Sequence, residues 1–370
     1  MRNLEDPSDL VSPATLDSLG FGPYFTAQQA LLGRPELVPA RIAGESPGCY
    51  QLLGCGPALG ELSGRLHADL TGLARPAVGD WVAIADSGGD RAIIHHVFDR
   101  RTAMVRRAAG RTGAPQIIAA NVDCVLVVTS ANRELNRRRL ERYLSAIWDS
   151  GAEPVILLNK IDLAGPGEVE EMIASVEQIA LGVSVLPVSA VTGAGCDALR
   201  SHVMPGRTAG LVGSSGVGKS SLINHLLGRD ALRAAAIDGE DRGRHTTTRR
   251  ELIATPACGV LIDTPGMREL GLAGDDGGLE ASFADIAALA GDCRFRDCAH
   301  GGEPGCAVEG AAGSGALDPA RLAGYRKLVR EIAAGERRRD PVAAEKDRRK
   351  WRAIHMAHRA RSKVDPKHRR

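Results

Sequence analysis

The stretch Gly213-Ser-Ser-Gly-Val-Gly-Lys-Ser-Ser221 decides the fold of this 370-residue chain. It satisfies the pattern G-x-x-x-x-G-K-S and stands between an apolar run, Thr208 to Val212, and a helical pattern, Ser221 to Leu227. In this setting the glycines let backbone N–H groups surround phosphate oxygens at a helix N-terminus. Lys219 is expected to bridge the β- and γ-phosphates, and the Ser220 hydroxyl to ligate Mg²⁺.

A guanine-recognition motif, Asn159-Lys160-Ile161-Asp162, stands well before this loop in the chain. The Asp162 carboxylate can accept hydrogen bonds from both the N1–H and the exocyclic amine of guanine, and adenine has no such pair of donors. Asn159 is expected to support the loop and the far edge of the base, and the stem of Lys160 to cover the ring. Ser189-Ala190, at the end of another predicted strand, is expected to offer a backbone N–H to the guanine oxygen.

Two further motifs follow the phosphate loop. Thr246, Thr247 and Thr248 lie in Arg242-Gly-Arg-His-Thr-Thr-Thr-Arg249, the position of a first switch, where one threonine must reach Mg²⁺ and the γ-phosphate; the sequence leaves open which one. Asp263 is expected to hold Mg²⁺ through water, and the Gly266 N–H to sense the γ-phosphate. The predicted nucleotide-binding residues are Asn159, Lys160, Ile161, Asp162, Ser189, Ala190, Gly213, Ser214, Ser215, Gly216, Val217, Gly218, Lys219, Ser220, Ser221, Thr247, Thr248, Asp263 and Gly266.

The order of these motifs is inverted relative to an ordinary GTPase. Rotating the list so that the phosphate loop comes first restores the usual order, so the sequence predicts a circularly permuted GTPase domain. Near-continuous apolar strands, such as Val122 to Thr129 and Val155 to Leu158, alternate with helical patterns at Arg138 to Trp148 and Glu168 to Ile179. This alternation is typical of a doubly wound parallel sheet that is covered on both faces.

The catalytic group is less clear from the sequence than the binding loops. Met267 follows Gly266, where Ras-like enzymes carry a water-orienting glutamine, and its side chain cannot polarise water. Slow intrinsic hydrolysis is therefore expected, on the order of 10⁻⁴ to 10⁻² s⁻¹, unless a partner completes the site. His245 is the best internal substitute and, with Lys219, the catalytic candidate. The alternative is that His245 has no chemical role.

A cluster of metal-binding residue types lies nearer the carboxyl terminus. Cys293, Cys298, His300 and Cys306 supply three thiolates and one imidazole within fourteen residues. This closed set of four predicts one structural Zn²⁺ that holds a small helical domain folded, the alternative being reduced, unliganded cysteines. The remaining cysteines are scattered, which suits a reducing compartment: Cys49, Cys55, Cys124, Cys196 and Cys258.

The segment before the GTPase motifs has the sequence pattern of a small all-β barrel. From about Val38 to Arg107, short β-like runs such as Gly60 to Leu66 alternate with Gly, Pro and Asp turns. Such a barrel offers a curved strand face to oligonucleotides, although it could instead merely pack against its neighbour. Five arginines are expected at its exit: Arg100, Arg101, Arg106, Arg107 and Arg111.

Charge is unevenly distributed along the chain. Residues 321–370 carry eighteen Lys and Arg against six Asp and Glu, a surplus of twelve positive charges in a chain whose net charge is +2. RNA is the polyanion expected to bind such a tail, the alternative being a solvated end that keeps the protein soluble. The start of the chain lacks a signal-peptide pattern and no apolar run reaches membrane-spanning length, so a cytoplasmic protein without a membrane partner is expected.

Taken together, these motifs resemble one family closely, the ribosome small-subunit-dependent GTPases of the RsgA (YjeQ) type. Its marks run over nearly the whole chain and include Pro76-Ala-Val-Gly-Asp-Trp-Val82, Gln116-Ile-Ile-Ala-Ala-Asn-Val-Asp123, Gly243-Arg-His-Thr-Thr-Thr248, Asp263-Thr-Pro-Gly266 and Cys293 to Val308.

The resemblance implies a multidomain α/β protein with an OB-fold barrel, a permuted P-loop GTPase and a zinc-binding helical domain. It further implies a factor that binds the small (30S) ribosomal subunit late in its maturation, contacts 16S rRNA, hydrolyses GTP faster when bound there and helps to release other assembly factors. The expected divisions are an arm (1–35), the RNA-binding barrel (36–110), the GTPase domain (111–275), the zinc-binding domain (276–335) and a basic tail (336–370).

Two alternatives to this enzyme remain open. One is a nucleotide-gated rRNA-binding scaffold in which hydrolysis only resets affinity. The other is a P-loop enzyme acting on tRNA or a metabolite, which would need a substrate pocket or further catalytic motif that the sequence does not display. A monomer is expected, because no heptad or other self-pairing pattern appears in the sequence.

Overall fold

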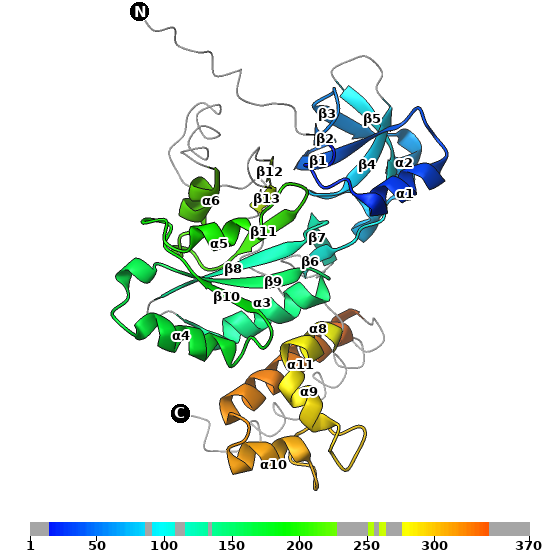
Figure 1. Cartoon of the computed structure of the whole chain (residues 1–370). Helices are drawn as coiled ribbons and strands as arrows, with labels where there is room; N and C mark the ends of the chain where they lie inside the picture. Colours follow the sequence, from blue (N-terminus) through cyan, green and yellow to red (C-terminus); the bar gives the residue numbers. More distant parts are fainter. Residues whose placement is uncertain are drawn as a thin grey trace, which may run out of the picture. The chain divides into compact units, whose positions relative to one another are not determined.

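The computed structural model describes residues 15–85, 91–107, 115–131, 135–227, 251–254, 259–263 and 276–339. The chain forms two compact units, Met1–Asp292 and Cys293–Arg370. The first unit contains a barrel and a nucleotide-binding sheet (Figure 1). The second contains the cysteine cluster. Among the described residues, every helix is too short or too polar to cross a lipid bilayer.

The small all-β barrel that the sequence predicts is confirmed, and five strands close it. Each strand pairs with the next in the order β1-β2-β3-β5-β4, and β4 pairs back with β1. Only β3 and β5 run parallel, and the other neighbours are antiparallel. This closure is the OB-type barrel that the resemblance implied. Its strands are β1 (Val38–Ser46), β2 (Cys49–Leu53), β3 (Leu59–Leu62), β4 (Trp81–Ala85) and β5 (Arg91–Val97).

The barrel interior follows the two-residue period of its strands. Alternate positions, such as Ala40 and Ile42 on β1 or Val82 and Ile84 on β4, are buried in one apolar cluster. The prediction of a strand over Gly60 to Leu66 is wrong in its second half, because the chain leaves β3 at Leu62 and begins helix α2 (Gly64–Asp69). The Ser63 hydroxyl caps this helix by accepting from the Leu66 N–H at 3.3 Å. A 3-10 turn, η2 (Gly72–Ala74), then leads to β4.

Residues ahead of β1 pack on the side of barrel strand β4 that faces away from the barrel interior. Helix α1 (Pro23–Leu32) starts with proline in its first turn and ends at Gly33, which has a left-handed φ of 64°. Phe21 and Phe25 are buried against Trp81, with ring centroids 4.8 Å and 5.9 Å from its ring. The sequence predicted only an arm over residues 1–35 and missed this helix.

The nucleotide-binding sheet has the order β10-β9-β8-β11-β13-β12, parallel except for β12. Helices α3 and α4 cover one face, while α5 and α6 cover the other (Figure 1). The doubly wound parallel sheet that the sequence predicts is therefore confirmed. Its strands are β8 (Cys124–Ser130), β9 (Glu153–Asn159), β10 (Ser184–Pro187), β11 (Thr208–Val212), β12 (Glu251–Ala254) and β13 (Val260–Asp263). Its helices are α3 (Arg137–Asp149), η3 (Ile161–Leu163), α4 (Glu168–Glu177), α5 (Cys196–Arg200) and α6 (Lys219–Leu227).

Backbone pairing joins the barrel to this sheet. Strand β12, which the sequence analysis did not identify, pairs with β13 on one side and, through Glu251 and Gly44, with β1 on the other. The two sheets thereby form one eleven-stranded sheet. A short hairpin of β6 (Ala103–Arg107) and β7 (Pro115–Ala120) lies between them in the chain.

A buried arginine stabilises the junction of barrel, amino-terminal segment and sheet. Arg41 is 1% exposed and donates to the carbonyl oxygens of Leu19, Gly79 and Asn121. The Asn121 side chain donates to the Gly79 carbonyl at 3.1 Å and accepts from the Arg101 N–H at 2.9 Å. Burial lowers the pKa of Arg41 to about 10, so the side chain stays charged at neutral pH. Two of the motifs that marked the family resemblance, around Gly79 and Asn121, meet at this arginine.

Among the described residues, helices α8 (Asp276–Ser282) and α9 (Ala284–Ala290) follow the sheet within the first unit. The Gly278 N–H donates to the Asp149 carboxylate at 2.7 Å, which connects α8 to the end of α3. The second unit has helices α10 (Ala307–Ser314) and α11 (Pro319–Arg339). Val308, Leu322 and Leu328 are buried in these two helices.

Gly79→Ala is expected to destabilise the protein by about 2–4 kcal/mol, because Gly79 has a φ of +93° and an added Cβ would overlap the Ala120 carbonyl oxygen. Gly33→Ala is the matched control, with a φ of +64° and no atom within 4 Å of the added Cβ. It should cost only about 1 kcal/mol of backbone strain. Urea unfolding of both variants measures the difference, and equal losses would show that the junction is not tightly packed.

Candidate functional site

The predicted phosphate and guanine motifs, which the structure describes, meet at one edge of the sheet. Parallel strands present their carboxyl ends on the same side, so loops that are distant in sequence become neighbours there. Strand β11 leads into the phosphate loop at Gly213, β9 ends at Asn159, and β10 ends shortly before Ser189. Strand β13 ends at Asp263. The inverted chain order therefore still assembles one site.

The Asn159 side chain links three of these segments. It is 1% exposed; its Nδ2 donates to the Val217 carbonyl at 2.8 Å, and its Oδ1 accepts from the Ala190 N–H at 3.1 Å. The sequence assigned Asn159 partly to the edge of the base, whereas its contacts here are with the protein. A bound guanine would share the Ala190 N–H with Asn159.

The carboxylate predicted to select guanine is held by a neighbouring hydroxyl. Ser189, which is fully buried, donates from Oγ to the Asp162 carboxylate at 2.5 Å and accepts from the Thr192 N–H at 3.2 Å. Lys160 has a left-handed φ of 66°, which turns the chain sharply between β9 and η3. The guanine-recognition loop is thus fixed by contacts within the protein.

The phosphate loop needs its glycines because of close neighbours. A Cβ at Gly213 would overlap the Val128 carbonyl oxygen, and one at Gly218 would overlap the Asn159 amide. Lys219 Nζ donates to the carbonyls of Gly213 and Ser214 at 2.8 Å and 2.6 Å. The ammonium group is therefore already within the loop that it would share with phosphate.

Sequence reasoning missed Arg139, which donates to the Ser214 hydroxyl of the phosphate loop. A signal was present: Arg137, Arg138 and Arg139 form the start of α3, where the helix dipole disfavours cations. Three arginines at a helix start do not stabilise the helix, so they indicate that their side chains interact with other groups. Here one of them adds positive charge beside the loop.

Several predicted residues lie outside the described part of the chain: His245, Thr246, Thr247, Thr248, Gly266 and Met267. Asp263 ends β13, and its backbone pairs with Glu251. The phosphate and guanine loops are thus described, and the switch segments are not.

The cysteine cluster forms in the second unit as predicted. The ligand atoms of Cys293, Cys298, His300 and Cys306 all lie within 4.8 Å of one another. The Cys293 and Cys306 sulfurs are 3.9 Å apart, and His300 Nδ1 is 3.6 Å and 3.5 Å from them. Tetrahedral zinc with thiolate and imidazole ligands would place such atoms about 3.5–3.8 Å apart. Burial lowers the pKa of His300, which favours the neutral imidazole that a metal needs.

Other side chains hold the loop that carries His300. The Glu303 carboxylate accepts from the N–H groups of Ala299 and Gly301 at 3.2 Å and 2.6 Å. Arg326 of α11 donates to the His300 carbonyl and to the Glu309 carboxylate. His300 itself has a left-handed φ of 54°, an uncommon conformation for a residue with a side chain. These contacts hold the backbone of the loop from which the imidazole projects.

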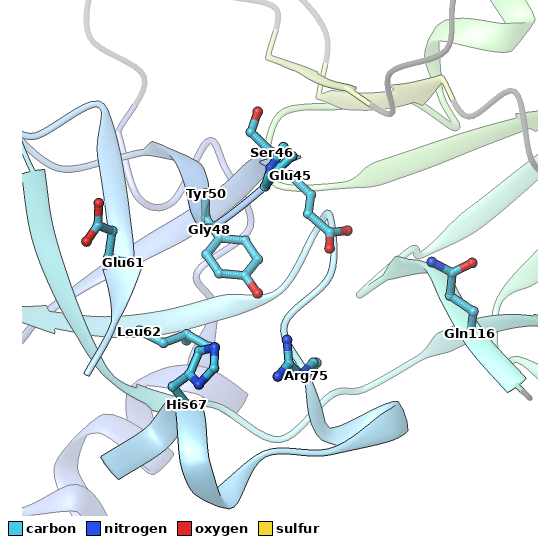
Figure 2. Close-up of a pocket in the computed structure, with 10 residues that line it drawn as sticks. Glu45, Ser46, Gly48, Tyr50, Glu61, Leu62, His67, Arg75 and Gln116 are labelled. Atoms are coloured by element: carbon cyan, nitrogen blue, oxygen red, sulfur yellow. The ribbon is translucent and has the colours of Figure 1, made fainter. Parts of the chain in front are cut away.

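The barrel carries a separate polar pocket of about 690 Å³ (Figure 2). Figure 2 shows the Tyr50 hydroxyl, His67 and Arg75 pointing into the same space. Glu45 and Glu61 add negative charge, although Glu61 pairs with Arg91. This mixed lining does not resemble a strongly basic RNA groove.

Two of the arginines expected at the barrel exit have intramolecular partners instead. Arg100 pairs with the buried Asp80 at 2.6 Å, and Arg101 pairs with Asp123 at 2.6 Å. Asp80 also accepts from the Ala77 N–H at 2.8 Å. These arginines stabilise the turn of the Pro76 to Val82 motif and the start of the sheet.

Comparisons with known proteins agree with this architecture. A family model described as RsgA GTPase matches residues 97–273. The chain is 44% identical over 364 residues to the small ribosomal subunit biogenesis GTPase RsgA of Opitutus terrae, covering 95% of this chain and 99% of that one. It is 50% identical over 255 residues to the protein of the same name from Streptomyces coelicolor, covering 68% and 69% of the two chains.

Solved structures share the fold. YloQ, described as a circularly permuted GTPase, superimposes with a TM-score of 0.58 at 25% identity, covering 83% of this chain and 98% of its own. YjeQ of Thermotoga maritima has a TM-score of 0.62 at 24% identity, covering 80% and 99%. The permuted order inferred from the motifs is thus found in a similar solved structure.

Arg326→Ala is expected to weaken metal retention about 10- to 100-fold, because the His300 loop loses its contact with α11. Arg330→Ala, one turn further along the same helix, is the control; Arg330 donates only to the Arg326 carbonyl among the hydrogen bonds described for it. The measurement is competition between the Zn²⁺-loaded protein and a chromophoric chelator. Equal retention in both variants would remove Arg326 from the metal site.

Proposed function

Because the chain belongs to the RsgA GTPase family, we propose that it hydrolyses GTP while it assists late maturation of the small ribosomal subunit. The observation that carries this proposal is the assembly of a phosphate loop and a guanine loop at one sheet edge, connected by Asn159. We further propose that the subunit stimulates hydrolysis and that turnover promotes release of other assembly factors. The expected setting is the cytoplasm, and the expected state is a monomer.

The binding step follows from the geometry of the loops. Backbone N–H groups of Gly213 to Ser221 would surround the phosphates, with Lys219 adding a cation. Asp162 would accept two hydrogen bonds from guanine, with its carboxylate held by Ser189. Mg²⁺, when bound with GTP, supplies neutralisation of the developing phosphate charge. Ser220 and Asp263 are the residues that we propose would hold this Mg²⁺, Asp263 through water.

The hydrolysis step lacks an internal water-orienting glutamine. Met267 stands in that place, and His245 is the proposed polar group in the first switch. Docking on the subunit would then complete the catalytic site and raise the rate. The roles of Thr246, Thr247 and Thr248 belong to the same proposal, and one of them would reach Mg²⁺.

We assign zinc to the cluster in the second unit. Three thiolates and one imidazole form a closed set, which leaves no open position for a substrate. Cys293, Cys298, His300 and Cys306 would hold the zinc ion, and the ion would supply cross-links that keep this segment folded. Its removal is therefore expected to unfold this segment rather than to affect the nucleotide chemistry directly.

GTP turnover measured with and without purified small subunits tests the main proposal. The expected intrinsic rate is on the order of 10⁻⁴ to 10⁻² s⁻¹, with a clear increase on adding subunits. Lys219→Ala should abolish both rates.

His245→Ala should lose the stimulated rate, and an unchanged stimulated rate would exclude His245 from the mechanism. Absence of any stimulation in the wild type would contradict the enzyme proposal. A His245→Ala protein that binds the subunit and still leaves it would favour a nucleotide-gated scaffold.

Asp162→Asn is expected to weaken GTP binding by at least about 100-fold, because two charge-assisted hydrogen bonds to guanine are lost. The carboxamide can instead donate to the extra carbonyl of xanthine, so affinity for XTP should rise. Asp197→Asn is the control, since that carboxylate is fully exposed on α5. Fluorescent-nucleotide displacement measures both affinities, and an unchanged preference for GTP would refute the assignment of Asp162.

A further inference from the structure

An exposed aromatic ring lies in the middle of the metal-binding loop. Phe295 is 42% exposed and stands between the ligands Cys293 and Cys298. A large apolar side chain normally packs into whatever core a small unit has, and Val308, Leu322 and Leu328 do so here. Phe295 instead presents its ring to solvent.

The loop that presents this ring is held on both sides. The Arg294 N–H donates to the Gly305 carbonyl at 3.0 Å, and the Cys298 N–H donates to the Phe295 carbonyl at 3.3 Å. Gly305 has a φ of +80°, and an added Cβ would press on the Arg294 stem at 3.0 Å. The backbone around Phe295 is therefore fixed before any partner arrives, which lowers the entropy lost on binding.

Cations flank the ring on both sides in the sequence. The Arg294 guanidinium carbon is 5.5 Å from the centroid of the Phe295 ring, and Arg296 is exposed. Asp297 and Glu303 are the carboxylates of the loop from Cys293 to Cys306, and of the two arginines and two carboxylates in it only the arginines adjoin Phe295 in the sequence. An aromatic face with neighbouring guanidinium groups is the combination that binds single-stranded nucleic acid, since bases stack on the ring and phosphates pair with arginine.

We propose that Phe295 is a stacking platform for one unpaired RNA base, with Arg294 and Arg296 contacting the adjoining phosphates. The proposal rests on the proposed function, because it names the contact through which the second unit would bind the RNA of the small subunit. A protein partner would use the ring as an apolar knob and would not require aromaticity. The distinction between a ring and an equally apolar side chain can therefore be tested.

The test uses the full-length, zinc-loaded chain with a non-hydrolysable GTP analogue. Binding of Phe295→Ala, Phe295→Leu and Phe295→Tyr is measured on purified small subunits and on protein-free small-subunit rRNA. Leu31→Ala is the control for loss of an exposed apolar side chain, since Leu31 is 87% exposed on α1. Zinc content and GTP hydrolysis without subunits should be unchanged in every variant.

Phe295→Ala and Phe295→Leu should weaken binding to both RNA targets about five- to a hundredfold, whereas Phe295→Tyr and Leu31→Ala should bind as the wild type does. Arg296→Ala should reduce the slope of log affinity against log salt by about 0.7. If Phe295→Ala or Phe295→Leu binds the RNA targets with wild-type affinity, the proposal of a stacking platform is overturned. Weakened binding to subunits but not to free rRNA identifies a protein partner and overturns it too. Failure of the wild type to bind or respond to subunits would instead contradict the proposed function.

Discussion

The buried amide of Asn159 is the interaction on which the nucleotide site depends. Its amide nitrogen donates to the Val217 carbonyl of the phosphate loop, and its oxygen accepts from the Ala190 N–H beside the guanine loop. One side chain therefore fixes the distance between the loops for the two ends of a nucleotide. Close approach of this amide also explains why residue 218 is glycine. An amide left without either partner inside the protein would cost about 1–3 kcal/mol, so the three segments are coupled in stability as well as in position.

Much of the fold could be predicted because its signals are local. Apolar runs identified the parallel strands, alternation with turns identified the barrel, and the spacing of glycine, lysine and serine identified the phosphate loop. Strand β12 escaped because four residues carry almost no periodicity and their partners lie far away in sequence. Helix α1 escaped because its buried residue Phe25 packs on Trp81 of a distant strand, and no helical stripe is needed for that contact.

The candidate sites divide in the same way. Residues whose side-chain chemistry would touch the ligand, such as Asp162 or Cys298, were identified from type and spacing. Arg326 and Arg139, which hold such residues in place, were not, and for Ser189 the contact of its hydroxyl with Asp162 was not, because these side chains act through partners that only the folded chain brings near. The ion pair of Arg100 with the buried Asp80 was not predicted either, because Asp80 lies 20 residues earlier and only the folded chain brings the two side chains together.

The permuted strand order has a consequence for synthesis of the chain. Strands β8, β9 and β10 emerge from the ribosome before β11, so the guanine loop is complete while the Asn159 amide still lacks Val217, its partner 58 residues later. A GTPase with the ordinary order makes its phosphate loop first and can complete the site by adding the base-recognition loop. Here the half-sheet of β8, β9 and β10 must remain folded until β11 inserts beside β8. Burial of its own apolar side chains is what stabilises it until then. A nucleotide can therefore stabilise the nascent chain only after β11 has inserted. Nucleotide binding then stabilises a sheet that has already formed and does not guide its formation.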